Sequence, residues 1–463
     1  MNNYTWVTVE KIISAVFAIA SLLILPRYLS ASDFGLIAII MIFVNIATVI
    51  IDSGLGGAII KNNSVKKEDY STVFTYNILI AIFLYIIIWI LAPSIAEFYK
   101  TSELTNLIRA VSTCFLITSL YMVDTLKLTK ELNFKVQSIF NIISRFTALA
   151  ISIILAVNNY GYWSITISLI ISHLVLLFLY KISVPFFYGL GFSKKSFLAM
   201  IPFGLSLSLS GLIRNLYINI LPTLIGRFFG LSAAGYFSQA NKFNDLFLRN
   251  VISILDKTSF PILCKVEKEK FKTNSLSLYT NVMFLVTPIL LLLSLTATDI
   301  INIALGKKWE ASAWYLAILC YSGIGLCIES VSRNILKAKG LGKEILIGEV
   351  VKLTALLIIS IPSSMFSLDL LFYNFIILTV FNFFYNIVLI RKKIGITVKE
   401  QITSLLKPIT LSFSVFIIIK LLIHPISNPI CNVLFITALF MLFYALGLYF
   451  LGVNISNFLR RKK

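Results

Sequence analysis

The feature that most constrains this chain is a succession of apolar runs, each about as long as a bilayer is thick. A helix needs about 20 mostly apolar residues to cross the hydrocarbon core. The connectors are short, so the sequence predicts an all-α integral membrane fold with about fourteen transmembrane helices. The runs cover approximately residues 11–29, 35–60, 73–93, 107–126, 138–157, 161–182, 203–226, 233–262, 278–298, 311–331, 346–362, 368–390, 406–423 and 429–452.

The composition agrees with a lipid-facing surface. Hydrophobic residues make up 58% of the 463 residues and charged residues 13%, whereas a soluble domain carries about 25% charged residues. The five cysteines form no CxxC pair and there are only two histidines, so we expect no metal and no cofactor. The first run lacks a basic segment before it, and we interpret it as a retained helix rather than a cleaved signal.

Basic residues in the connectors predict the orientation. With the N-terminus in the cytoplasm, the inward connectors, the adjoining helix ends and the C-terminal tail carry 27 Lys and Arg, against six in the outward connectors and their helix ends. Cytoplasmic loops are enriched in Lys and Arg in this way. We therefore expect both termini in the cytoplasm, and we attribute the net charge of +20 to topology and contact with anionic membrane lipid. We expect no nucleic-acid partner.

A short internal repeat predicts two lobes. Arg27, Ser32 and Gly35 recur 200 residues later as Arg227, Ser232 and Gly235, each time with an aromatic residue after the Arg. Six helices separate the copies, and parallel repeats of this kind build transporters with a substrate site between the halves. The predicted domains are an N-lobe of helices 1–6 (1–190), a C-lobe of helices 7–12 (191–395), and helices 13–14 with a basic tail (396–463).

Polar residues inside the apolar runs are candidates for a wet cavity, because a charge inside a span costs about 2.5–3.5 kcal/mol. In the run 233–262 six polar residues fall within about 80° of each other on a helical wheel. The interpretation is a cavity lining, and the alternative is a stripe that neutralises itself. These residues are Ser238, Lys242, Asp245, Arg249, Ser253 and Asp256.

Two further runs have polar faces: Ser206, Ser210, Arg214 and Tyr217 in one, Asn141, Arg145 and Ser152 in the other. Arg145 and Arg214 have no acid within four residues. Each must find a partner on another helix or sit in water, where its planar fork would suit a phosphate.

The remaining charges have simpler interpretations. Glu329 and Arg333 are spaced i, i+4, and Glu349 and Lys352 i, i+3, so we expect each pair to form within its own helix. For Asp52 and Asp124 we favour surface positions over coupling-ion sites. The sequence contains no Gly-rich phosphate loop and no Ser/His/Asp arrangement, and it predicts a transporter rather than an enzyme.

Four segments resemble the polysaccharide-transport branch of the multidrug/oligosaccharidyl-lipid/polysaccharide exporter superfamily, the Wzx-type O-antigen flippases. They are 25–35 (LPRYLSASDFG), 52–60 (DSGLGGAII), 159–163 (NYGYW) and 235–240 (GYFSQA) continuing to 260–261. The resemblance implies a multi-pass protein of the bacterial cytoplasmic membrane. The implied substrate is an oligosaccharide on undecaprenyl pyrophosphate, an O-antigen, capsule or exopolysaccharide unit, flipped outward by alternating access.

The family's cationic cavity would correspond to Arg27, Arg145, Arg214, Lys242 and Arg249. The implied partners are the lipid-linked substrate, membrane lipid, and the polymerase and glycosyltransferases of the same pathway. The alternatives are a peptidoglycan lipid-precursor flippase, a drug/cation antiporter of the same superfamily and a membrane glycosyl-polymerase. An antiporter favours an acidic cavity, and a polymerase needs a large outer loop, so both fit this sequence less well.

Overall fold

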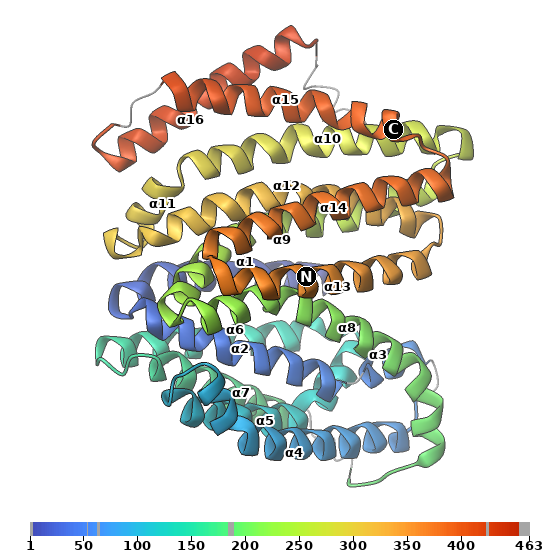
Figure 1. Cartoon of the computed structure of the whole chain (residues 1–463). Coiled ribbons are helices and arrows are strands. Elements are labelled where there is room, and N and C mark those ends of the chain that lie inside the picture. The colour runs from blue at the N-terminus through green and yellow to red at the C-terminus, as the bar shows by residue number, and fades with distance from the viewer. Residues whose placement is uncertain (1–2, 53, 63–64, 184–188, 423–425, 453–463) are drawn as a thin grey trace. The chain divides into compact units, whose positions relative to one another are not determined.

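The computed structural model describes residues 3–52, 54–62, 65–183, 189–422 and 426–452, without the side chains of residues 3–4 and of some positions between 203 and 268. Every regular element in these ranges is a helix (Figure 1). The long helices are α1 (Asn3–Tyr28), α2 (Ala31–Asp52), α4 (Lys67–Phe98), α5 (Glu103–Lys130), α6 (Phe134–Val157), α7 (Trp163–Ser183), α8 (Lys194–Phe228), α9 (Leu231–Lys265), α10 (Lys268–Leu295), α12 (Ala311–Ala338), α13 (Gly342–Phe366), α14 (Leu368–Ile394), α15 (Val398–Leu422) and α16 (Pro429–Phe450). The short elements are α3 (Leu55–Lys61), α11 (Ala297–Ala304) and the 3-10 turn Lys307–Trp309.

Each of the fourteen long helices covers most of one predicted run, and the end of the run 35–60 forms the short helix α3. Within the described residues, twelve are long and apolar enough to cross a membrane. The two long helices outside that set are α8 and α9, which carry two of the predicted polar faces. The all-α membrane fold is therefore confirmed.

One predicted span, 35–60, is broken into two helices, α2 and α3. Gly54 takes the left-handed conformation, with φ 63°, just before α3. A Cβ atom placed on it would lie 2.2 Å from the carbonyl oxygen of Gly204 in α8, so only glycine fits. Glycine does not interrupt the hydropathy of the segment DSGLGGAII, so the sequence predicted one continuous span and the break was missed.

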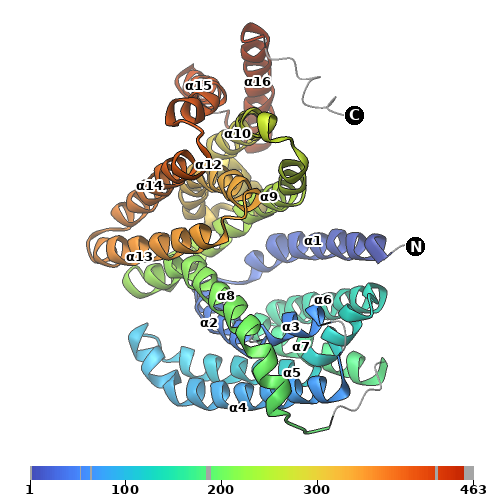
Figure 2. The same cartoon turned by 90° about the vertical axis from the view of Figure 1, so that its right-hand side faces the viewer.

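Two prolines lie inside α8. Pro202 and Pro222 sit within the continuous helix Lys194–Phe228. Each removes a backbone donor and its ring crowds the preceding turn. In agreement, α8 is visibly curved along its length (Figures 1 and 2).

Contacts between Cα atoms divide the chain into two compact units, residues 1–235 and 236–463. Helix α4 shows how the first unit packs. Its large side chains point outward, with Leu79, Phe83 and Ile90 each more than half exposed, while Ala81 and Ala92 are fully buried. Lipid is as apolar as leucine, so membrane helices associate through small residues that let the backbones approach.

The two copies of the sequence repeat contact each other inside the first unit. A Cβ atom on Gly35 would lie 2.0 Å from the carbonyl oxygen of Leu231, and one on Gly235 would lie 1.8 Å from that of Ala31. Leu231 and Ala31 are themselves 200 positions apart. The first turns of α2 and α9 therefore cross in a reciprocal backbone contact that requires glycine on both sides.

The segment 159–163 also packs against the first turn of α2. Ser30 and Asp33 form a capping box at the start of α2: the Ser30 N–H donates to Asp33 Oδ2 at 2.8 Å, and the Asp33 N–H donates to Ser30 Oγ at 3.2 Å. Asp33 Oδ1 also accepts from the Tyr162 N–H at 3.2 Å. The segments 25–35 and 159–163 thus meet, and residue 235 packs on the first of them.

Candidate functional site

The three predicted arginines of the first unit are all exposed. Arg27 lies in the last turn of α1, Arg145 in α6 and Arg214 in α8. In the described part of the chain, neither Arg145 nor Arg214 has a hydrogen bond or an acid within ion-pair distance. Inside a membrane span such a charge requires water or an anion.

The polar face predicted for α6 is partly structural. Ser138 Oγ and Asn141 Nδ2 donate to the two carboxylate oxygens of Glu10 in α1, at 3.0 Å and 3.1 Å. Ser152 is buried and donates to the carbonyl of Leu149 in its own helix. Arg145 is therefore the exposed charge on this face, while its polar neighbours hold α1 against α6.

The stripe predicted on α9 lies on one continuous helix, so its members share a face. Lys242 is exposed, and Ser238, Asp245 and Ser253 are half-buried. Asn241 Nδ2 donates to Asp245 Oδ2 at 3.4 Å. The half-buried Tyr217 lies on α8. The side chains of Ser210, Arg249 and Asp256 lie outside the described part of the structure.

Asp124 is not the surface residue we expected. Its side chain is 0% exposed and accepts a hydrogen bond from Lys181 Nζ at 2.8 Å. Asp124 lies on α5, and Lys181 lies near the end of α7. The Lys181 side chain is 42% exposed, and its ammonium also lies over the Phe74 ring. The expectation was wrong because the acid finds a cation on a helix that is distant in sequence.

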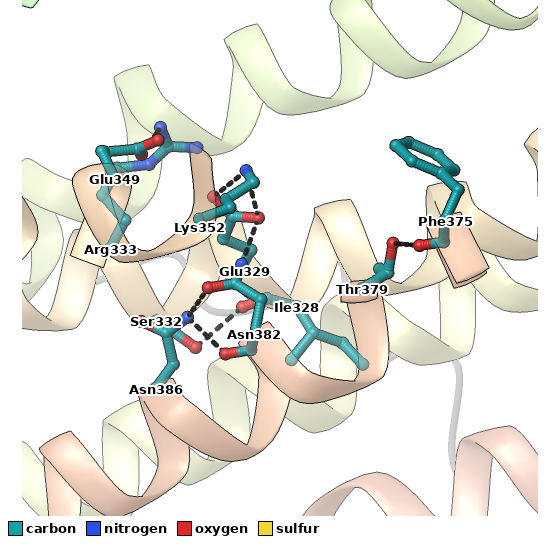
Figure 3. Close-up of polar contacts among 10 residues, drawn as sticks. All are labelled: Ile328, Glu329, Ser332, Arg333, Glu349, Lys352, Phe375, Thr379, Asn382 and Asn386. Carbon is teal, nitrogen blue, oxygen red and sulfur yellow. Dashed lines mark hydrogen bonds and ion pairs between the residues drawn. The ribbon is translucent and has the colours of Figure 1, made fainter. Parts of the chain in front are cut away.

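The second unit contains a larger network of ion pairs between α12, α13 and α14 (Figure 3). Lys352 Nζ donates to both carboxylate oxygens of Glu329, at 2.9 Å and 3.0 Å. Asn382 Nδ2 donates to Glu329 Oε2 at 2.7 Å, and Asn386 Nδ2 donates to the Asn382 carbonyl at 2.8 Å. Arg333 Nη1 lies 3.4 Å from Glu349 Oε1.

These pairs correct the expectation that Glu329 would bond Arg333 and Glu349 would bond Lys352 within their own helices. Both pairs form between α12 and α13 instead. The sequence did hold a signal for this: Glu329 lies eleven residues before Gly340, and Lys352 eleven residues after Leu341. In an antiparallel helix pair joined at that turn, residues equally distant from it face each other.

The network continues to the end of the helices. Lys393 Nζ on α14 donates to Glu344 Oε1 on α13 at 2.8 Å. Among the described residues there is no group of three or more His, Cys, Asp or Glu arranged to hold a metal ion. The chemistry these clusters offer is ion pairing and hydrogen bonding inside apolar helices.

The long apolar helices form a multi-pass membrane protein. Its family and relatives make it a transport protein rather than an enzyme. The chain belongs to the polysaccharide biosynthesis protein family, which matches residues 24–314. This confirms the predicted branch of the multidrug/oligosaccharidyl-lipid/polysaccharide superfamily and the placement in the bacterial cytoplasmic membrane.

Two relatives and one solved structure illustrate the similarity. The teichuronic acid biosynthesis protein TuaB of Bacillus subtilis (strain 168) is 24% identical over 355 residues, which cover 73% of this chain and 71% of that protein. The lipopolysaccharide biosynthesis protein WzxC of Escherichia coli (strain K12) is 22% identical over 353 residues, covering 73% and 70%. The lipid II flippase MurJ, in an inward closed conformation, has the same fold, with a TM-score of 0.75, 16% identity, and 96% of this chain and 99% of that chain covered.

Proposed function

We propose that this protein is a flippase that moves an oligosaccharide linked to undecaprenyl pyrophosphate across the cytoplasmic membrane, from the inner leaflet to the outer leaflet. Its relatives named for teichuronic acid and lipopolysaccharide biosynthesis support a polysaccharide precursor as the substrate class. The observation that carries the proposal is the pair of exposed span arginines, Arg145 and Arg214, without an acid partner in the described chain.

A pyrophosphate is the substrate group that such arginines suit. It cannot cross hydrocarbon unaided, because moving an ion out of water costs many kcal/mol unless opposite charges surround it. A guanidinium offers two parallel donors to phosphate oxygens. Carrying about two negative charges outward across a potential of about 100 mV, inside negative, yields roughly 4.6 kcal/mol if the charge crosses the whole field. The membrane potential is therefore a sufficient drive for much of the step.

The proposed substrate contacts are Arg27, Arg145, Arg214, Lys242 and Arg249, with Ser210, Tyr217, Ser238, Asp245, Ser253 and Asp256 lining the cavity. The two lobes, 1–190 and 191–395, would alternate access to the two faces, and helices 13–14 (396–463) complete the fold. The polymerase and glycosyltransferases of the same pathway are the proposed protein partners. Cytoplasmic termini belong to the same proposal.

Replacing Arg145, Arg214 and Arg249 by Ala, one at a time, tests the proposal in a strain that lacks its own flippase. Losing one charged hydrogen bond costs about 1.5–3 kcal/mol, so surface glycan should fall by about tenfold or more at equal protein level. The corresponding Lys variants should fall less, because the charge remains and the planar fork is lost.

Arg109 supplies the matched control. Its guanidinium stacks on the Trp89 ring at 4.0 Å and donates to the Trp89 carbonyl at 3.4 Å, so it is an arginine of the same unit with a structural partner. Arg109→Ala should restore glycan as the wild type does. Normal glycan from all three test variants would refute the proposed contacts. Cell lysis on depletion without loss of surface glycan would instead favour a peptidoglycan precursor.

A further inference from the structure

The four charges between α12 and α13 form a square, which we call the charge square: Glu329, Arg333, Glu349 and Lys352. Glu329 and Lys352 make its distal pair, farther from the Gly340–Leu341 turn, and Arg333 and Glu349 its proximal pair. The distal pair is the more enclosed, with side chains 9% and 11% exposed, against 29% and 28% in the proximal pair.

The signs alternate around this square. Because α12 and α13 are antiparallel, each level holds one acid and one base across the helix interface (Figure 3). Along α12, Glu329 and Arg333 are spaced i, i+4, and along α13, Glu349 and Lys352 are spaced i, i+3. Residues at these spacings are neighbours on a helix and pair when their charges are opposite. Pairing across the interface or along each helix therefore satisfies all four charges.

Arg333 is the residue that the observed arrangement uses least. It meets Glu349 through one contact at 3.4 Å. Its buried Nε atom has no hydrogen-bond partner within the described residues. A guanidinium has five N–H donors, so Arg333 retains free donors for the carboxylate one turn away on its own helix.

We infer that the charge square is a latch with two settings, and that transport requires it to switch between them. In the observed setting both pairs bridge α12 and α13 and hold the helices together. In the other setting each helix pairs its own charges, so α13 separates from α12 without leaving a charge buried and unpaired, which would be strongly unfavourable. Two discrete packings of the same residues are the usual basis of a switching element.

The surroundings of α13 favour this helix as the moving one. Its outer face is apolar and exposed, with Leu346, Val350 and Ile358 between 44% and 66% exposed. On its other side Gly348 lies against Tyr385 of α14, where a Cβ atom would come within 3.1 Å of the ring. Glu329 stays bonded to Asn382 of α14, so the acid keeps one partner while Lys352 leaves.

Exchanging the charges of one pair tests the latch, because it keeps the pairing across the interface and destroys the pairing along the helices. The proximal exchange R333E/E349R puts two acids on α12 and two cations on α13 while each level still joins opposite charges. The distal exchange E329K/K352E does the same with the roles reversed, and Asn382 then turns its amide oxygen to the new cation. The four-fold variant E329K/R333E/E349R/K352E restores both settings.

The readout is surface glycan in a flippase-null strain, with protein level and unfolding temperature in detergent measured alongside. We expect the proximal exchange and the distal exchange each to accumulate and unfold like the wild type but to transport at least about tenfold less. A tenfold loss corresponds to shifting a two-state equilibrium by one decade. The four-fold variant should return to within about twofold of the wild type. A control exchange of the outer pair, E344K/K393E, should transport normally, because that pair lies outside the square.

A purely structural role gives the opposite result, since each exchange keeps the observed pairs. Wild-type transport by the proximal exchange would overturn the latch. Failure of that exchange to accumulate would also contradict it, because the pairs it retains are those said to hold the helices. The inference depends on the chain being a transporter and not on which saccharide it carries: if the wild-type gene restores no glycan, the proposed substrate fails instead.

Discussion

Each unit contains a buried acid inside a membrane helix, and the two acids are neutralised by lysines that differ in exposure. Asp124 lies on α5 and Glu329 on α12, each the fourth long helix of its predicted lobe, and each meets a lysine from another helix. Lys181 is 42% exposed, whereas Lys352 is 11% exposed. The Asp124–Lys181 pair is therefore open to the outside of the protein on its lysine side, whereas the Glu329–Lys352 pair is enclosed.

The difference in exposure determines how each pair can rearrange. Lys181 can leave Asp124 by itself, because the ammonium already reaches the exposed end of α7 and rests on Phe74. Glu329 is bonded to Lys352 and Asn382 and lies next to a second ion pair. Its charges can only rearrange together, so the enclosed network suits a cooperative switch, whereas the open pair can break without moving other charges.

The largest expected effect comes from breaking the enclosed pair. Lys352→Met leaves Glu329 buried without its cation and should lower the free energy of unfolding by about 3–5 kcal/mol. Thermal unfolding of the purified protein in detergent measures this. The double variant E329Q/K352M removes both charges and should recover most of the loss. A single variant as stable as the wild type would show that the enclosed pair holds nothing.

The open pair should respond less. Lys181→Met removes the partner of Asp124, but the vacated space adjoins an exposed position, so water reaches the carboxylate. We expect a loss of about 1–3 kcal/mol in the free energy of unfolding, the cost of one unsatisfied buried group. The same unfolding assay measures it beside Lys352→Met. Equal losses in the two variants would remove the distinction between the units.

The smallest effects concern a type of turn that occurs once in each unit. The turn after α5 passes through Leu132 and the turn after α12 through Gly340, both left-handed, with φ 55° and 72°. The same two hydrogen bonds to the last helical turn close both of them. A left-handed conformation costs a non-glycine residue about 1–2 kcal/mol. Gly340→Ala should therefore destabilise by about 1 kcal/mol. Leu132→Gly should stabilise by about 0.5 kcal/mol, because the added chain entropy offsets part of the relief.

Opposite signs for these two substitutions, read from unfolding temperatures, would confirm that the turns are equivalent and that only their residues differ. The same sign for both would show that side-chain contacts of Leu132, and not its backbone, determine the first turn.

The helices were predictable from the sequence because the length needed to cross a bilayer is a local property of each run. The break at Gly54 was not, because it depends on the close approach of Gly204. The ion pairs of Asp124 and Glu329 were missed for a related reason: their partners lie on helices whose neighbours the sequence does not state. The lack of an acid partner for Arg145 and Arg214 was predictable, because an isolated charge inside an apolar run is visible without knowing the neighbours; their role in substrate binding stays a prediction.

The sidedness of the substrate shows whether the protein moves a lipid-linked oligosaccharide from the inner to the outer leaflet. In a strain lacking this gene, an enzyme that modifies the glycan would be added to intact spheroplasts and to permeabilised ones. We expect the lipid-linked oligosaccharide to be modified only after permeabilisation, and outer-leaflet material to appear again once the wild-type gene is returned. Lipid-linked oligosaccharide modified equally in intact and permeabilised spheroplasts of the deletion strain would contradict it.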